Sequence, residues 1–539
     1  MKLRKIYTSA GILLLSLFCI GDAVAKDAKF ETGVSFGSTG ADEPYSSLTD
    51  KDGNYYISGM CRGDVEFADG ATIKGRGGMD AVIVKYDAEL NFLWARAVGG
   101  SKDDTFERIA VTSAGDIVAV GKISGDVTID GTDQTLSGTQ STDGCIVVYD
   151  KDGNYKSSAQ IKAAGASLCY SVAVDKSDNI FVTGSTVGAT DFGNEKTVTI
   201  DGGNPGTFLA CYNNSLVCQW AIAGSSPVQS YGWAVSFDKE ENILLTGRFG
   251  TTFTITGTDG EALTTAVGSE SSQDTYVAKL SHEGVGQWIT YVTNSNRIDT
   301  RSIDSDSQGN VYIWGHCQSA VTPEGQSPLG FNGNFDSFLI KYSSAGAYLD
   351  GMNLGGSGRD EAKSLFVDAD DNIYVAGNVN GDGSKGGTAV NMNPRGESKD
   401  YTFKGHDGYV AKYNGSTWEL MQLEKTVTPD NANQHEVAWC VTMSPDYNKV
   451  YVTGYFNNGA TVFDGASLTL PFVRDYDIYT VLYSYTLMVK TKTLEPGVAN
   501  EPYYSNIVVD NVEGAVKFEI VSGALPDGIT LSKDGAFAG

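Results

Sequence analysis

A six-residue pattern that ends in glycine occurs seven times along this chain of 539 residues. Each copy places aliphatic or aromatic residues before a small residue and the glycine, as in NIFVTG and NIYVAG. The glycines follow one another at intervals of 62 to 77 residues, at Gly59, Gly121, Gly184, Gly247, Gly315, Gly377 and Gly454. Such regular repetition is the sequence signature of architectures in which copies of one unit stack on each other. One globular core is therefore excluded, as the length already suggests.

Each copy of the pattern has companion segments on both sides. A short apolar stretch with an Asp- and Asn-rich turn precedes it, as at residues 171–179 and 364–372. An alternating stretch follows it, as at residues 80–86 and 274–280. A fourth stretch comes after most copies, often with a tryptophan, as at Trp94, Trp220, Trp288 and Trp418. Because the turn residues suit hairpins, each copy predicts four short antiparallel strands.

The number of strands in each copy determines how the copies must pack. A sheet of four short strands cannot bury both faces alone, so neighbouring copies must stack face to face. Seven such sheets predict an all-β fold, a seven-bladed β-propeller of four-stranded blades. The last copy lacks a fourth strand of its own, and residues 33–38 can supply one. We therefore expect the N-terminal strand to complete the last blade, within residues 437–484, and to remove an open sheet edge.

The composition agrees with a β-rich, turn-rich chain. It includes 65 Gly, 28 Tyr and 22 Phe with 19% charged residues, which excludes a coiled coil and a collagen. The net charge of −27 at pH 7 repels phosphate backbones, so nucleic acid is excluded as a partner.

One repeat unit carries a family resemblance. The segment DAVIVKYDAELNFLWARAVGG, residues 80–100, resembles the bacterial β-propeller repeat known as SBBP. The resemblance extends over about residues 32–484 and all seven copies. It implies a protein that is exported, often surface-associated, and without an assigned reaction, so it supports a fold more than an activity.

The first 25 residues have the pattern of an export signal. Basic residues at 2, 4 and 5 precede an apolar run at 12–20 and the small-residue sequence Ala-Val-Ala at 23–25. This predicts a signal peptide at 1–25, with processing as a lipoprotein at Cys19 as the alternative. The run is too short for a membrane span, and no later segment could form one. We expect the mature chain at the cell surface or outside the cell, with the periplasm as an alternative.

The last part of the chain has a different composition. Residues 496–504 and 522–539 resemble immunoglobulin-like modules appended to bacterial surface proteins. About four strands fit before the end, whereas such a sandwich has about seven. The predicted organisation is a signal peptide at 1–25, the propeller at 26–490 and an incomplete immunoglobulin-like β-sandwich at 491–539.

Cysteine, histidine and acidic turns give no regular metal site. The seven cysteines after the signal have no CxxC spacing, so zinc is not predicted, and no cofactor is expected. Cys211 and Cys218 are the candidate disulfide, with two buried thiols as the alternative. The four histidines lie in different copies without ligand spacing. Acidic turns such as residues 50–54 are interpreted as hairpin turns, and calcium loops are the alternative.

One position has varied chemistry in every copy. Alignment of the copies on their glycines brings seven residues to the same place before the first strand enters the sheet, and we refer to them as the ring residues: Tyr45, Glu107, Tyr170, Trp233, Arg301, Lys363 and Trp439. Carboxylates lie nearby at Asp42, Glu43, Asp104, Asp299, Asp360, Glu361 and Glu436. Aromatic and polar groups in one concavity suit a sugar or a peptide, so we predict a ligand site. The alternative is that these side chains wedge between adjacent blades.

No catalytic motif is present: the chain lacks a GxSxG elbow, a Walker loop and a Rossmann fingerprint. We therefore predict an exported, noncatalytic and monomeric binding or scaffold protein, whose loop-rich propeller face meets a polysaccharide or protein ligand. One alternative is a carbohydrate-active enzyme, in which Glu107 and Asp360 would be the paired acid and base. Another is a purely structural spacer on the cell surface.

Overall fold

The computed structural model describes residues 28–485 except 267–272, 381–387, 404, 428–434, 458–461, 464–469, 472 and 474, together with short strands on either side of that range. The chain divides into two compact units. The larger comprises Thr32–Tyr447 and Tyr451–Leu482, and the other comprises Met1–Glu31, Asn448–Val450 and Tyr483–Gly539. Apart from one three-residue 3-10 turn, Asp201–Gly203, the regular elements of the described residues are strands. No helix among these residues is long and apolar enough to cross a membrane.

The seven copies fold as antiparallel four-stranded units, and each begins with a hairpin of two strands. The first strands are β5 (Glu43–Thr49), β11 (Thr105–Val111), β15 (Ser167–Val174), β21 (Ser230–Phe237), β27 (Ile298–Ser305), β32 (Glu361–Val367) and β38 (Glu436–Met443). The second strands contain the repeated glycine pattern: β6 (Tyr55–Cys61), β12 (Ile117–Ile129), β16 (Ile180–Thr186), β22 (Ile243–Phe249), β28 (Val311–Cys317), β33 (Ile373–Asn380) and β39 (Lys449–Phe456). The predicted strand order within a copy is confirmed by the pairing of the strands.

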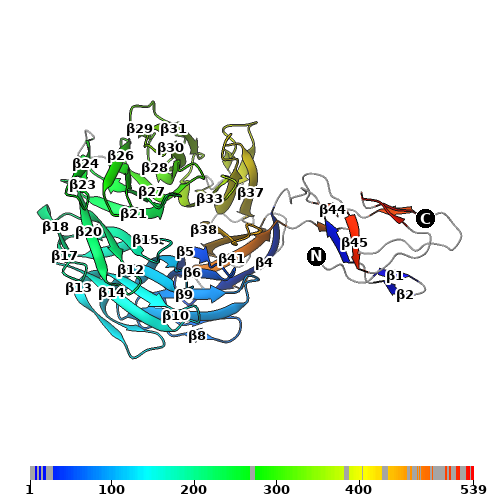
Figure 1. Cartoon of the computed structure of the whole chain (residues 1–539), viewed down its shortest axis with the longest axis horizontal. Coiled ribbons are helices and arrows are strands. Elements are labelled where there is room, and N and C mark those ends of the chain that lie inside the picture. Colours follow the sequence, from blue (N-terminus) through cyan, green and yellow to red (C-terminus); the bar gives the residue numbers. More distant parts are fainter. Residues whose placement is uncertain are drawn as a thin grey trace. The chain divides into compact units, whose positions relative to one another are not determined.

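Each unit ends with two further strands. The third strands are β9 (Asp80–Tyr86), β13 (Thr135–Tyr149), β19 (Gly206–Tyr212), β25 (Asp274–Leu280), β30 (Asp336–Tyr342), β36 (His406–Tyr413) and β41 (Asp477–Ser484). The fourth strands are β10 (Phe92–Gly100), β14 (Tyr155–Ala163), β20 (Cys218–Ser225), β26 (Gly286–Thr293), β31 (Tyr348–Leu354), β37 (Leu420–Val427) and β4 (Lys29–Phe36). The last sheet has the order β38-β39-β41-β4, so the N-terminal strand completes it as expected. Figure 1 shows blue β4 beside orange β41.

Hairpins between the second and third strands protect the sheet edges. Residues from these connections pair with the fourth strand of the preceding copy: β12 with β10, β17 (Gly188–Asp191) with β14, β23 (Thr252–Thr256) with β20, β29 (Thr322–Pro323) with β26, and β40 (Val462–Phe463) with β37. The partners of two of these strands are β18 (Thr197–Ile200) and β24 (Ala262–Ala266). Two further hairpins form separate two-stranded sheets: β7 (Val65–Glu66) pairs with β8 (Thr72–Ile73), and β34 (Thr388–Asn391) pairs with β35 (Asp400–Phe403). The added strands cover edges that would otherwise offer free backbone groups.

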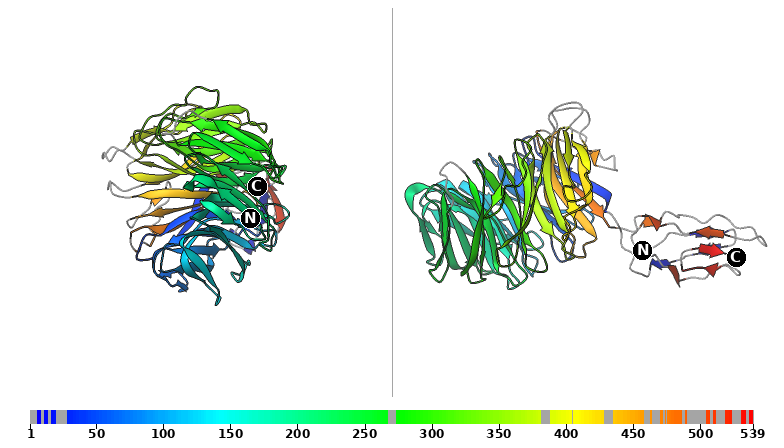
Figure 2. Two further views of the ribbon diagram at one scale, coloured as in Figure 1. Left: turned by 90° about the vertical axis from the view of Figure 1, so that its left-hand side faces the viewer. Right: turned by 90° about the horizontal axis from the view of Figure 1, so that it is seen from above.

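The core lies between neighbouring sheets, and the second and third strands are buried on both faces. Tyr55 of the first copy packs with Tyr451 and Ile478 of the last copy. The next residue, Tyr56, faces the other way and packs with Ile117 of the second copy. Alternate residues therefore serve two different interfaces, which explains why these strands are apolar throughout. Figure 2 shows the sheets of this unit standing side by side.

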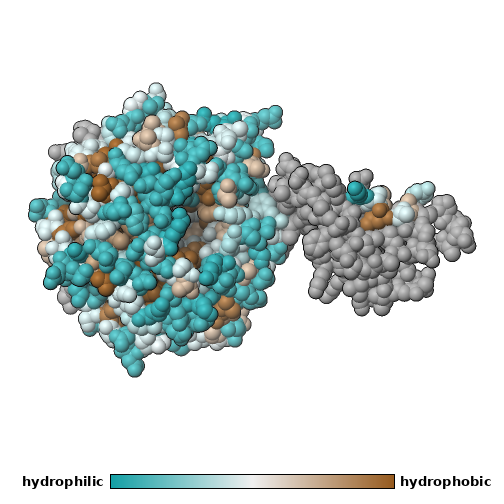
Figure 3. Space-filling view, in the orientation of Figure 1, coloured by the Kyte–Doolittle hydropathy of each residue, from teal (hydrophilic) through white to brown (hydrophobic). Residues whose placement is uncertain are grey.

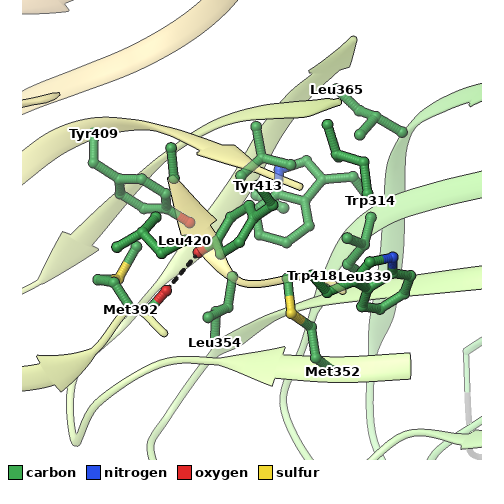
Figure 4. Packing of buried hydrophobic residues seen from close by; sticks show 14 of the residues in the cluster. Trp314, Leu339, Met352, Leu354, Leu365, Met392, Tyr409, Tyr413, Trp418 and Leu420 are labelled. Atoms are coloured by element: carbon green, nitrogen blue, oxygen red, sulfur yellow. Dashed lines mark hydrogen bonds between the residues drawn. The ribbon is translucent and has the colours of Figure 1, made fainter. Parts of the chain in front are cut away.

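The fifth and sixth copies show the same packing at close range (Figure 4). Trp314 and Met352 of the fifth copy share a cluster with Leu365, Tyr413 and Trp418 of the sixth. The Tyr413 hydroxyl donates a 2.9 Å hydrogen bond to the backbone carbonyl of Met392, so its polar end is satisfied within the apolar cluster.

The tryptophans of the fourth strands link neighbouring copies. Trp94 Nε1 donates to the carbonyl of Lys151 at 3.1 Å, and its indole lies against Gly153 in the hairpin turn of the next copy. Trp288 repeats this contact with Ser344 at 3.1 Å and with Gly346. Both glycines have a positive φ, 80° and 85°, and a Cβ there would lie under 3 Å from the indole. The recurring tryptophan is thus a contact between blades.

The acidic turns are hairpin turns in the structure. Asp50 Oδ1 accepts the backbone N–H groups of Asp52 and Asn54, each at 2.9 Å, and its Oδ2 accepts Asn54 Nδ2 at 2.8 Å. The same arrangement recurs at Asp150, Asp175, Asp238, Asp306 and Asp368. Among the described residues, no group of three or more His, Cys, Asp or Glu could hold a metal ion.

The candidate disulfide does not form. Cys211 and Cys218 are both free and buried, and they belong to β19 and β20, which face each other across a hairpin. The strand register pairs Cys211 with Trp220 and Cys218 with Tyr212, so the two cysteines are not cross-strand partners. The alternative of two buried thiols is the one that the structure adopts.

The second unit contains short paired strands. β1 (Ile6–Thr8) pairs with β2 (Gly11–Leu13), β3 (Ser16–Cys19) with β45 (Phe518–Ser522), β42 (Met488–Val489) with β44 (Val509–Asp510), and β47 (Ala536–Ala538) with both β43 (Tyr504–Asn506) and β46 (Thr530–Leu531). Most of residues 1–27 and 490–539 lies outside the described residues. The signal peptide and the immunoglobulin-like module therefore stay predictions.

Candidate functional site

A β-bulge presents the ring residue in each of the first six copies. The register between the first and second strands shifts by one residue at Tyr45, Glu107, Tyr170, Trp233, Arg301 and Lys363. The residue before each bulge pairs with the repeated glycine, as Cys169 pairs with Gly184. A bulge leaves one residue out of the ladder and re-aims its side chain. The first strand therefore turns one side chain per copy away from the sheet.

The repeated glycine is required by the close approach of the bulged strand. A Cβ on Gly184 would overlap the carbonyl oxygen of Leu168, and one on Gly377 would lie 2.5 Å from the carbonyl oxygen of Glu361. Neither glycine has a positive φ. The glycine pattern that defines the repeat is thus the counterpart of the bulge that defines the ring, since only glycine allows the strands to come this close.

The seven ring residues line one pocket, together with Arg108 and Ser364. The alignment on glycines therefore predicted which residues would meet. It missed Arg108 and Ser364, each of which directly follows a ring residue, because a bulge interrupts the alternation of side chains on a strand. The pocket has an accessible volume of about 60 Å³. One water needs about 10–15 Å³ on this scale, so the space holds a few waters or one small chemical group.

Aromatic side chains from neighbouring copies contact each other around the pocket. Tyr45 and Trp439 have ring centroids 5.5 Å apart, and Tyr170 and Trp233 have centroids 4.4 Å apart. Tyr231 stacks on the indole of Trp233 at 5.5 Å with an angle of 17°. The ring residues thus both line the pocket and pack against one another, so the expected concavity is narrow.

Three cations, Arg108, Arg301 and Lys363, also line the pocket. The Lys363 ammonium lies 4.2 Å from the centroid of Trp439 and donates to Glu361 at 2.8 Å. The Arg301 guanidinium lies 5.4 Å from the centroid of Trp233, and Arg108 Nη2 donates to the Arg301 carbonyl at 3.4 Å. These contacts hold the positive groups against aromatic faces, which attract cations through the ring quadrupole.

Glu107 is the carboxylate that lines the pocket. It accepts a 2.7 Å hydrogen bond from the Thr105 hydroxyl. Burial raises the pKa of Glu107, and the charges of Lys122 and Arg301 oppose that shift. Burial lowers the pKa of Lys363 and of Arg108, and the positive charge of Arg301 adds to both shifts. The pocket is a crowded, predominantly positive site.

Three of the seven carboxylates expected around the ring are bound to the backbone. Asp104 accepts the N–H groups of Gly100 at 3.0 Å and Ser124 at 2.7 Å. Asp360 accepts those of Gly356 and Asn380 in the same way, and Asp42 accepts those of Ser38 and Arg62. Serines replace them in the third and fourth copies, where Ser167 and Ser230 accept the N–H groups of Gly144 and Thr207. We refer to these as the latch residues: Asp42, Asp104, Ser167, Ser230 and Asp360.

The latch residues lie on the first strands or directly before them, three positions ahead of the ring residues. All five are buried. Burial raises the pKa of Asp42 to about 6 and those of Asp104 and Asp360 to about 7 each, although the backbone N–H groups oppose the shift. Asp360 does not line the pocket, so the structure does not gather the Glu107 and Asp360 pair of the enzyme alternative there.

The other predicted carboxylates have different partners. Asp299 pairs with Arg248 at 3.1 Å and Arg297 at 2.7 Å, Glu43 accepts the Tyr45 hydroxyl at 3.2 Å, and Glu361 pairs with Arg359 at 2.6 Å and Lys363 at 2.8 Å. Glu436 is buried on β38. None of these residues lines the pocket, so they surround the ring without facing its centre.

Two of the four histidines lie together, which the sequence did not indicate. The rings of His406 and His435 stack with centroids 4.0 Å apart. His282 contacts Asp175 at 2.6 Å, and His316 is buried beside Asp299 at 3.6 Å. Burial lowers the pKa of His406 to about 4, and the neighbouring His435 adds to this shift.

Comparison with known proteins identifies the repeat. The family model of the SBBP β-propeller repeat matches residues 158–193, which extend from β14 to the hairpin after β17. The chain is a β-propeller repeat protein. This β-propeller repeat protein is also 22% identical over 435 residues to an uncharacterized WD repeat-containing protein of Acanthamoeba polyphaga mimivirus. That alignment covers 66% of this chain and 31% of the viral protein, so the chain matches about a third of its relative's length.

Solved structures align with this chain at low TM-scores and low sequence identity. A streptogramin B lyase aligns with a TM-score of 0.34 and 8% identity, over 84% of this chain and 97% of the lyase. Sqt1 from Chaetomium thermophilum aligns with a TM-score of 0.38 and 9% identity, over 85% of this chain and all of that protein. A protein of unknown function from Bacteroides caccae aligns with a TM-score of 0.29 and 11% identity, over 57% of this chain and 78% of the other.

Proposed function

We propose that this protein is an exported, noncatalytic seven-bladed β-propeller that binds a polysaccharide or protein partner at the mouth formed by the ring residues. The signal-like residues 1–25 support export, and the tail at 491–539 supports an appended immunoglobulin-like module. The mature protein acts as a monomer at the cell surface or outside the cell.

The observation that carries this proposal is the chemical variety at the ring position. The seven copies keep glycine at the repeat position and small acceptors at most latch positions, whereas the ring has two Trp, two Tyr, an Arg, a Lys and a Glu. Simple filling of space around an axis does not need seven side chains of five residue types, aromatic, basic and acidic. A varied set of aromatic and charged groups at one concave point is typical of a site that recognises an asymmetric partner.

The size of the pocket defines how a partner can meet it. Sites that enclose a drug-sized ligand have roughly 300 Å³ or more, and this pocket has about 60 Å³. A whole sugar ring does not fit inside. The partner therefore rests on the surrounding loops and places one group between the ring residues.

The test is a binding screen with matched variants. The purified chain is assayed against polysaccharides and against proteins of the same cell surface, beside Trp233→Ala and Trp439→Ala and a control, Trp288→Ala, which removes an indole on an outer strand. We expect specific binding by the wild type and the control, and loss of binding in both ring variants. Binding that survives both ring substitutions would place the partner elsewhere and contradict the proposal.

A further inference from the structure

The charge of the pocket is opposite to that of the molecule. The chain has 39 Lys plus Arg against 66 Asp plus Glu, yet three cations and one carboxylate line this small space: Arg108, Arg301, Lys363 and Glu107. Glu361 neutralises Lys363 from outside the lining, through the 2.8 Å contact. Glu107 is then the carboxylate of the lining that attracts both guanidinium groups, while Asp299, outside the lining, also attracts Arg301. The two guanidinium groups repel each other.

Three buried N–H groups of the lining residues have no protein acceptor. They are Nε of Arg108, Nε of Arg301 and Nε1 of Trp233, and no hydrogen-bond partner for them exists among the described residues. Buried donors are nearly always paired, because an unpaired one loses its hydration without compensation. These three atoms are closed off from the pocket's open space, so a ligand meets the other N–H groups of the two guanidinium groups.

The volume and the overall charge select the kind of acceptor. A pocket of about 60 Å³ admits a group of few atoms. The net charge of −27 repels multiply charged anions such as phosphate polymers more strongly than it repels a single charge. Arginine forks match the two oxygens of a carboxylate through paired N–H groups.

We propose that the ring pocket binds one carboxylate group, held by Arg301 and Arg108. This inference rests on the proposed function only for the source of the carboxylate, which is either a free small acid or the acidic end of the partner. The carboxylate balances the excess of positive charge that Arg108 and Arg301 bring to the lining.

The experiment measures anion binding to the full chain through indole fluorescence and thermal unfolding. Sodium acetate, sodium glucuronate and a polyglucuronate are titrated at constant ionic strength against sodium chloride, with glucose as the uncharged counterpart of glucuronate. A bound carboxylate raises the unfolding temperature with concentration, because it binds only the folded state. We expect a response to acetate and glucuronate but not to glucose or to equal chloride.

Variants separate this site from general salt effects. Arg301→Gln is expected to weaken acetate binding at least tenfold, whereas Arg395→Gln, at an exposed pair with Asp350, is expected to leave it unchanged. Glu107→Gln removes the competing negative charge and is expected to strengthen acetate binding about threefold or more. A merely structural role of Glu107 would not produce tighter binding. A response identical in Arg301→Gln, or weaker binding in Glu107→Gln, would overturn the inference.

The results distinguish a failure of the carboxylate inference from a failure of the proposed function. Binding of acetate and glucuronate without any polysaccharide or protein partner supports the carboxylate pocket and contradicts the proposed partner. A partner that depends on Trp233 and Trp439 while no carboxylate binds supports the proposed function and overturns this inference. Polyglucuronate that binds more tightly than glucuronate identifies the acidic end of a polymer as the source, and equal affinity identifies the free acid.

Discussion

The ring residues and the latch residues lie three positions apart in the same repeat, and they differ in how much the residue type varies between copies. The latch has aspartate or serine at five of seven positions, and each side chain accepts a backbone N–H. The fifth copy departs from this with Ile298, where the adjacent Asp299 pairs with arginines instead. The ring has aromatic, basic and acidic residues. A latch side chain must accept a backbone N–H group, so few residue types fit at that position. A ring side chain turns away from the sheet at the bulge and has no such requirement, so its residue type varies between copies.

Figure 3 shows one face of the molecule coloured by hydropathy. On the face shown, the hydrophobic residues are scattered among hydrophilic ones. The large exposed hydrophobic residues include Leu93, Leu349 and Met421, which lie on three different outer strands, β10, β31 and β37. Apolar residues scattered singly are ordinary surface, so they do not compete with the ring as a binding site.

The largest expected effect comes from the glycine on which the bulge depends. Gly184→Val places a branched side chain where the carbonyl of Leu168 already lies, with Phe208 on the other side. We expect a loss of roughly 3 kcal/mol or more of unfolding free energy, because backbone cannot move aside as a flexible side chain can. Urea unfolding followed by tryptophan fluorescence measures it.

Gly330 provides the matched control for this substitution. It has open space around its Cα and no positive φ, so Gly330→Ala is expected to change the unfolding free energy by about 0.5 kcal/mol or less. Equal losses in Gly184→Val and Gly330→Ala would show that the close approach at the bulge is unimportant.

The latch gives the next largest effect. Asp104→Ala leaves the buried N–H groups of Gly100 and Ser124 without an acceptor, so we expect a loss of about 2–4 kcal/mol of unfolding free energy. Asp104→Asn keeps one acceptor oxygen and is expected to lose less than half as much. If both variants unfold like the wild type, the latch carboxylate contributes nothing to stability.

The protonation of the latch predicts a pH dependence. The pKa values of Asp104 and Asp360 are raised to about 7 in the folded state, above the ordinary value of about 4 in the unfolded chain. The folded state then binds more protons between these values, so this contribution is fully present below about pH 4 and is lost as the pH rises through 7. We expect the unfolding temperature to fall between pH 5 and pH 8.

The matched variant for this dependence is the double substitution Asp104→Asn and Asp360→Asn. It removes two groups with raised pKa values and is expected to flatten the decline in unfolding temperature between pH 5 and pH 8. A decline as steep as that of the wild type would assign the pH dependence to other carboxyl groups, such as Asp304 and Asp336, whose pKa values burial raises to about 6.

The sequence predicted the strands, the N-terminal closure and the meeting of the ring residues, because a repeat turns one alignment into a set of equivalent positions. It could not predict which carboxylates face the pocket. The partners of Asp104 are Gly100 and Ser124, whose N–H groups carry no side-chain signal. Arg108 was missed because the bulge at Glu107 breaks the alternation of the strand, and that break is visible only in the register.

The smallest effect on stability is expected at the ring itself, and its size is compared with that of the latch variant Asp104→Ala. Burial lowers the pKa of Arg108 in the folded protein, and the charge of Arg301 adds to this shift. Arg301→Gln removes that charge and relieves the repulsion between the two guanidinium groups. It also gives up the contact with Trp233. Since these changes oppose each other, we expect the unfolding free energy to change by less than about 1 kcal/mol. Urea unfolding at neutral pH measures it beside Asp104→Ala, and a loss as large as that of the latch variant would show that the ring is held for stability rather than for binding.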